Sequence, residues 1–286
     1  MPIGGIRFLL LAALAQVALP STPAASIDFH FTSDAVLQQG VAAATAQWTA
    51  RCLDGGAFAD FAKNFAPDQQ MDVAARQAQT AKFDRAEFVR VATDAWRTAN
   101  AALPQGPLRV CVDLVPTADA FTRDLMGGVA AVTAGEGRVI LRIHPDANWQ
   151  RVLPYAIAHE MHHSYWVGRH FDPARPFTLA DYLVLEGRAD YFAGTLFTSS
   201  PPWITALDAA AYETAWRAVS KELNSTEWGT LQAVMFGAPQ AGIPMWAGYS
   251  IGFRLVSNRM ARAPQLDLAA MTAAPASEFI PPLSSK

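Results

Sequence analysis

The stretch Ala158-His159-Glu160-Met161-His162-His163 decides how this chain is interpreted. It contains the pattern H-E-x-x-H and follows an apolar run at residues 152–158, which predicts that it lies on a helix. Residues four apart on a helix share a face, so His159 and His163 can present two imidazoles to one metal ion. Glu160 can then reach a water held by that metal, which is the pattern of a zinc-dependent hydrolase.

Two further residues of this segment bear on its structure. Pro154 comes early, and the first turn of a helix tolerates proline. His162 points about 100° away from His163 on a helical wheel, so we expect it to flank a metal site rather than to bind the ion. The alternative for the whole segment is a surface helix with scattered histidines.

A catalytic zinc site needs three protein ligands and one open position, so the two histidines require a third partner. One known extension of the motif places a glycine three residues and a histidine six residues after the second histidine. Here those positions hold Trp166 and Arg169, and His170 comes one residue too late. This continuation is therefore excluded.

The segment 179–192 supplies a glutamate instead. Its apolar residues recur at helical spacing, and Glu186 and Asp190, four residues apart, interrupt the apolar stripe. Buried carboxylates are unfavourable unless they are paired or bind a metal. We therefore predict Glu186 as the third ligand and Asp190 as an acceptor for a ligand histidine's N–H. The alternative is an exposed helix whose acidic residues are balanced by Arg188.

Residues 167–176 lie between these two predicted helices and are rich in glycine and proline, which is typical of a loop. A helix–loop–helix connection folds the second helix back onto the first. The loop is therefore expected to bring Glu186 to the pair of histidines.

Three motifs occur together in this chain: H-E-M-H-H at 159–163, E-G-R-A-D-Y-F at 186–192 and W-A-G-Y-S-I-G-F at 246–253. A Gly-rich segment at 127–133 precedes them. The set resembles the gluzincin zinc peptidases. More narrowly, it resembles a family of predicted Zn-dependent proteases that is known mainly as a domain of unknown function. The resemblance covers roughly residues 105 to 280.

The resemblance implies a metallopeptidase-like core with one zinc ion on His159, His163 and Glu186. It also places Tyr249 near the site, where we consider it a candidate donor to the oxyanion that develops during hydrolysis. The alternative for Tyr249 is a buried tyrosine in a core helix. Glu160 is the predicted general base.

The predicted function is therefore an exported, zinc-dependent metallopeptidase that cleaves peptide or protein substrates through a zinc-activated water. The alternative is a metal-binding, non-catalytic binding or chaperone-like module on the same scaffold. Two histidines and one glutamate favour the enzyme, because structural zinc sites usually close with Cys and His ligands.

The first 25 residues are typical of a secretory signal peptide. Arg7 precedes an apolar run at 8–15, and small residues follow at 24–26. That run is too short for a comfortable membrane span, so we expect a periplasmic or extracellular protein. An uncleaved anchor is the alternative. In such a compartment Cys52 and Cys111 could form one disulfide.

Composition limits the partners. The 286 residues are 51% hydrophobic and 16% charged, which allows a sizeable core, and the net charge is −3. Because the sequence contains no Lys/Arg cluster of the kind that nucleic-acid binding requires, we expect no nucleic-acid partner. No stretch after the signal segment is long enough to cross a membrane. The sequence leaves the oligomeric state open.

The remaining patterns predict an α+β fold that is mostly helical, with a small β-sheet next to a zincin-type pair of helices. Residues 26–104 are expected to form an N-terminal helical region. Helices are predicted at 34–50 and 84–103, and Asp84 can cap the second.

Residues 105–286 are expected to form the zincin-like core. A strand is predicted at 108–115, and a hairpin or two adjacent strands at 129–133 and 138–143. Gly127 and Gly128, directly before the first of these strands, allow close approach of another backbone, or mark a bend. Later helices are predicted at 208–223, 226–236 and 245–260.

Overall fold

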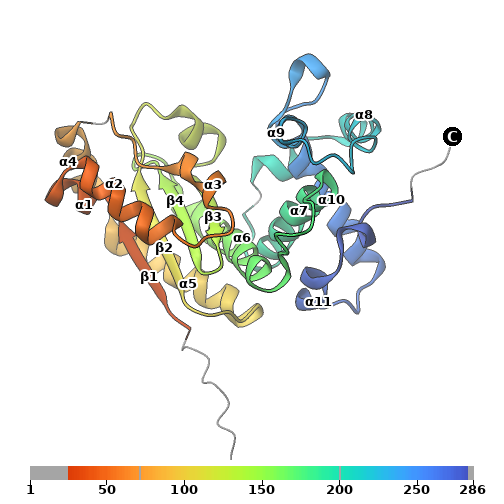
Figure 1. Ribbon diagram of the computed structural model, residues 1–286, viewed down its shortest axis with the longest axis horizontal. Coiled ribbons are helices and arrows are strands. Elements are labelled where there is room, and N and C mark those ends of the chain that lie inside the picture. The colour runs from red at the N-terminus through yellow and green to blue at the C-terminus, as the bar shows by residue number, and fades with distance from the viewer. Residues whose placement is uncertain (1–24, 71, 200, 283–286) are drawn as a thin grey trace, which may run out of the picture.

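The computed structural model describes residues 25–70, 72–199 and 201–282. Apart from its last residue, the predicted signal peptide lies outside these ranges. The described chain is mostly helical and contains a four-stranded sheet, which confirms the predicted α+β class (Figure 1). None of the described helices is long and apolar enough to cross a membrane.

The sheet has the strand order β1-β2-β4-β3, in which β1, β2 and β4 run parallel and β3 is antiparallel to β4. Strands β3 and β4 form a hairpin, so the predicted hairpin is confirmed. Because β3 lies at the edge, one row of its backbone N–H and C=O groups faces away from the sheet. The strands are β1 (Ile27–Phe31), β2 (Leu108–Leu114), β3 (Val129–Gly135) and β4 (Arg138–Ile143).

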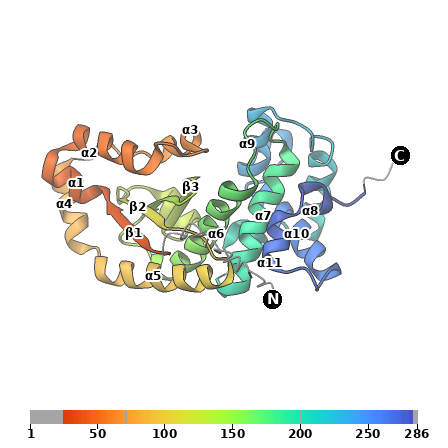
Figure 2. The same cartoon turned by 60° about the horizontal axis from the view of Figure 1, so that its bottom comes forward.

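Two long helices, α5 and α6, pack together and cover one face of the sheet (Figure 2). The core between them and the strands is closely packed and apolar, with Phe88, Leu141 and Ile157 fully buried. The helices of the N-terminal half are α1 (Thr32–Gln39), α2 (Val41–Trp48), η1 (Thr49–Leu53), α3 (Ala59–Ala62), η2 (Lys63–Phe65), α4 (Val73–Lys82), α5 (Arg85–Ala102) and η3 (Phe121–Leu125).

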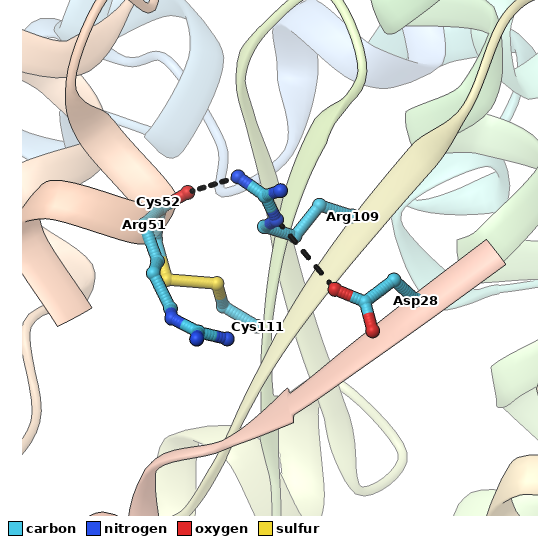
Figure 3. The surroundings of a disulfide bond; sticks show 5 residues. All are labelled: Asp28, Arg51, Cys52, Arg109 and Cys111. Atoms are coloured by element: carbon cyan, nitrogen blue, oxygen red, sulfur yellow. Dashed lines mark hydrogen bonds and ion pairs between the residues drawn. A yellow bond between two sulfur atoms is a disulfide. The ribbon is translucent and has the colours of Figure 1, made fainter. Parts of the chain in front are cut away.

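The opposite face of the sheet is covered by the segment from α2 to η2 (Figure 2). A disulfide between Cys52 in η1 and Cys111 in β2 joins this segment to the sheet (Figure 3). Arg109 adds a polar link, because its Nη1 donates to the carbonyl oxygen of Arg51 at 3.3 Å and its Nε lies 3.7 Å from Asp28 (Figure 3).

The C-terminal half is a second cluster of helices built on α7 and α10, and α6 lies between it and the sheet (Figures 1 and 2). Its apolar core includes Leu183, Leu231 and Ile251. The helices of this half are α6 (Trp149–His170), α7 (Leu179–Leu196), η4 (Pro202–Thr205), α8 (Ala209–Val219), α9 (Trp228–Phe236), η5 (Pro239–Ala241), α10 (Ala247–Arg262), α11 (Leu268–Ala273) and η6 (Ala276–Glu278).

Some local predictions need correction. The helix predicted at 34–50 is two helices, α1 and α2, because Gly40 adopts φ 83° and ends the first. Pro154 is not in the first turn, since α6 begins at Trp149 and contains the proline in its interior. The cap at Asp84 is confirmed, because its side chain accepts from the backbone N–H of Glu87.

The region 26–104 is mostly helical but also supplies strand β1, which pairs with β2 in the common sheet. Helix α5 of the same region packs on α6, which carries the H-E-x-x-H motif. The boundary at residue 104 stays a prediction.

Candidate metal centre

Helices α6 and α7 pack side by side and bring the three predicted metal ligands together. His159 Nε2 lies 2.9 Å from His163 Nε2 and 3.2 Å from Glu186 Oε2, and His163 Nε2 lies 3.4 Å from the same carboxylate oxygen. All three residues are buried. The loop after α6 therefore returns the chain as the sequence predicted.

Asp190, one turn after Glu186 on α7, orients the first histidine. Its Oδ1 lies 2.9 Å from His159 Nδ1, and it also accepts from the Tyr155 hydroxyl at 3.0 Å and from Trp203 Nε1 at 3.1 Å. With Nδ1–H donated to Asp190, the lone pair of neutral His159 is on Nε2, which faces Glu186. Asp190 therefore lies within hydrogen-bond distance of His159, and its supporting role stays a prediction.

The three converging groups influence one another's protonation. Burial alone would raise the pKa of Glu186, but the neighbouring His163 and His159 outweigh it and lower the pKa to about 2. Burial alone would lower the pKa of His159, but Asp190 and Glu186 raise it well above its usual value. A carboxylate and two imidazole nitrogens directed at one point form the donor set that zinc binds in open sites.

Glu160 lies next to His159 on α6 and lines the same cavity as the ligands. The hydroxyl of Thr133 on β3 lies 2.8 Å from Glu160 Oε2 and 2.9 Å from the carbonyl oxygen of Glu160. Burial raises the pKa of Glu160 from its usual value, although His163 and His159 act against this. A raised pKa suits a carboxylate that must accept a proton near neutral pH.

Tyr249 reaches the site because α7 and α10 cross at two glycines. A Cβ at Gly187 would overlap the carbonyl oxygen of Gly252, and a Cβ at Gly252 would overlap that of Leu183. This close crossing places Tyr249, in the first turn of α10, on the cavity wall with Glu186. Burial, and then the charge of Glu186, raises the pKa of Tyr249 well above its usual value.

Two other residues of the motifs do not join the three donors. His162 is fully buried, with Nε2 3.1 Å from the Thr272 hydroxyl, so it packs against α11 as a flanking residue. Arg188 does not balance Glu186 or Asp190 as an exposed ion pair. It is buried, donates to the carbonyl oxygens of Thr272 and Ala274, and thereby holds the C-terminal segment on α7.

The site opens into a cavity of about 700 Å³. Its wall combines the edge strand β3, helices α6, α7, α9 and α10, and the N-terminal segment α3–η2. Most of the lining is apolar. The aromatic side chains in it are Phe58, Phe61, Phe65, Phe121, Phe171, Phe177, Tyr182, Trp203, Trp228, Phe236, Trp246 and Tyr249.

Several residues that shape this site could not be predicted from the sequence. Thr133 ends the Gly-rich segment that was noted only for its glycines. Tyr155 and Trp203 share Asp190 with His159, and in sequence they resemble ordinary core aromatics. Phe61 comes from the N-terminal region, for which the sequence predicts helices but no part in the site.

Two histidines from one helix and a glutamate from the next form a donor set found in open, catalytic zinc sites, and a further glutamate lines the adjoining cavity. Comparison with known proteins agrees. Residues 88–281 match the model of the family described as predicted Zn-dependent protease (DUF2268). The chain belongs to this family.

A curated relative of the chain is the uncharacterized protein YjfC of Bacillus subtilis (strain 168). It is 28% identical over 156 residues, which are 50% of this chain and 51% of that protein. The matched region therefore spans about half the length of the relative. No solved structure matches the chain.

Proposed function

We propose that this protein is an exported metallopeptidase that hydrolyses peptide bonds with one zinc ion held by His159, His163 and Glu186. The observation that carries the proposal is the convergence of these three buried donors at a large cavity, with Glu160 beside them. The family description supports the same chemistry, because it names a zinc-dependent protease.

Bound zinc would supply the Lewis acid that polarises the scissile carbonyl and lowers the pKa of the attacking water. Glu160 accepts the proton of that water and returns it to the leaving amine. Asp190 keeps the His159 ring directed at the ligand position. Tyr249 donates a hydrogen bond to the developing oxyanion.

The peptide substrate is proposed to bind in extended form along β3. The outer edge of this strand faces away from the sheet, and residues 129–133 line the cavity. Backbone hydrogen bonds to such an edge bind a peptide without regard to its side chains. This position would place the scissile bond between β3 and the H-E-x-x-H helix.

Export is part of the proposal. The predicted leader at 1–25 supports it, and so does the disulfide between Cys52 and Cys111, because disulfides persist mainly in oxidising compartments. Fractionation of cells that produce the full chain would test it. Protein retained in the cytoplasm with free thiols would contradict export.

Metal analysis and peptide cleavage test the enzymatic proposal. The purified protein should contain about one zinc, and His163→Ala should lose it. Glu160→Gln should retain zinc but lose hydrolysis of a peptide library. Zinc retained by His163→Ala would refute the ligand set. Full zinc without cleavage of any peptide would favour the non-catalytic, metal-binding alternative.

A further inference from the structure

The cavity next to the metal centre is closed in part by the segment α3–η2, which lies outside the family-matched residues 88–281. The backbone N–H of Phe58 donates to the carbonyl oxygen of Ala134 at the end of β3, at 2.8 Å. The Cys52–Cys111 disulfide ties the preceding turn to β2. The segment is therefore held over the cavity by a covalent and a backbone contact.

Trp228, the first residue of α9, lines the same cavity as this segment. Its side chain is 53% exposed, although tryptophan is among the residues most buried on average. The rings of Phe61 and Trp228 meet edge to face with their centroids 5.8 Å apart. Two residues far apart in sequence thus meet at the cavity wall, and Figure 2 shows that their elements, α3 and α9, come from opposite halves of the molecule.

Few charged side chains line the cavity. Glu160 and Glu186 belong to the metal centre, and Arg142 is paired with Asp119 at 3.6 Å. Most of the other side chains that line the cavity are apolar, and Leu231 is one of them. A large apolar side chain fits this chemistry, whereas a charged one would lose its hydration without a partner.

We infer that Phe61 and Trp228 form an aromatic clamp that selects peptide substrates carrying a large apolar side chain close to the scissile bond. This inference rests on the proposed function, because the selected side chain belongs to the peptide that the metal centre cleaves. The N-terminal region contributes Phe61 to the clamp, and α9 contributes Trp228. The apolar side chain of the substrate enters between the two rings. Each ring then packs against this side chain instead of against the other ring.

The test uses peptides that are identical except at one position, which is Phe, Leu, Ala, Asp or Lys. Further sets place this variable residue at each neighbouring position of the peptide. Binding is measured by calorimetry to zinc-loaded Glu160→Gln, which retains the site without requiring turnover. Cleavage by the wild type is measured in parallel. The binding measurement tests the clamp even if no peptide is cleaved. Failure of the clamp can therefore be distinguished from failure of the proposed peptidase activity.

At one of the tested positions, peptides with Phe or Leu should bind about 10- to 100-fold more tightly than the peptide with Ala. Peptides with Asp or Lys at that position should bind most weakly. Phe61→Ala or Trp228→Ala, added to Glu160→Gln, should reduce that preference to about 3-fold or less while zinc content stays at the parent level. Val73→Ala is the control, because Val73 is an exposed apolar residue that does not line the cavity.

Binding that ignores the identity of the side chain would overturn the clamp, and so would an unchanged preference in both alanine variants. If a variant unfolds, Phe61→Leu and Trp228→Phe replace it. These conservative changes should retain selectivity for the smaller apolar side chains. Loss of all preference in them as well, with zinc and thermal stability intact, would also contradict the assignment.

Discussion

Thr133 on the edge strand β3 is hydrogen-bonded to Glu160 on the H-E-x-x-H helix. Its hydroxyl lies 2.8 Å from Oε2 of that glutamate and 2.9 Å from its carbonyl oxygen, and both residues are buried. The strand proposed to bind substrate therefore also positions the proposed general base. A bulge between Thr133 and Gly135 ends the regular part of the strand directly after this contact.

Thr133→Val should lower kcat by about 10- to 100-fold, because a carboxylate that is free to rotate is misplaced for proton transfer. KM and zinc content should remain near the wild-type values, since Thr133 is not one of the three donors. Thr133→Ser is the matched control and should restore most of kcat. Retained kcat in Thr133→Val together with a loss in Thr133→Ser would show that the methyl packing, rather than the hydroxyl, matters.

Asp190→Asn should weaken zinc binding by about 10- to 100-fold, because His159 loses the charged acceptor that fixes its ring. Competition with a chelator of known affinity measures this directly. Asp94→Asn, an exposed residue of α5 in surface ion pairs, should leave zinc affinity unchanged. Wild-type zinc affinity in Asp190→Asn would remove Asp190 from its orienting role.

Tyr249 should act as a donor over the whole working pH range. Burial and the charge of Glu186 disfavour the phenolate and raise its pKa, so the hydroxyl stays protonated up to at least pH 10. Tyr249→Phe should therefore lower kcat by about 100- to 1,000-fold and leave the shape of the pH profile between 6 and 10 unchanged. A basic limb present in the wild type and absent from the variant would contradict this.

The crossing of α7 and α10 should tolerate no side chain. Gly252→Ala is expected to lower the free energy of unfolding by about 1–3 kcal/mol or more, because the added methyl overlaps the Leu183 carbonyl. Gly194→Ala is the control on α7, where an added Cβ meets nothing within 4 Å and alanine favours the helix. Thermal unfolding of both variants compares them. Equal stability would mean that the crossing relaxes freely.

The convergence of the three candidate metal donors could be predicted from the sequence because their geometry is local. His159 and His163 are one helical turn apart, and a short loop is enough to return Glu186 to them. Thr133 could not be predicted, because its role depends on how β3 packs against α6. Phe61 and Trp228 meet only through the tertiary fold, and no sequence periodicity relates residues so far apart.

Removing the disulfide tests whether the segment carrying Phe61 must be tied to the sheet. Cys52→Ser combined with Cys111→Ser should lower the free energy of unfolding by about 4 kcal/mol, because a cross-link over 59 residues restricts the unfolded chain. It should also raise KM for peptides with large apolar side chains and leave kcat and zinc content unchanged, since the metal donors lie on α6 and α7.

Arg109→Ala is the control for this variant, because it removes only the polar link between η1 and the sheet. The Arg109 side chain is 44% exposed, so its ion pair with Asp28 contributes little to stability. Steady-state kinetics on Phe- and Ala-containing peptides distinguish the two effects. If the double serine variant loses stability but retains its selectivity, the Phe58–Ala134 backbone contact alone is enough to hold the aromatic segment over the cavity.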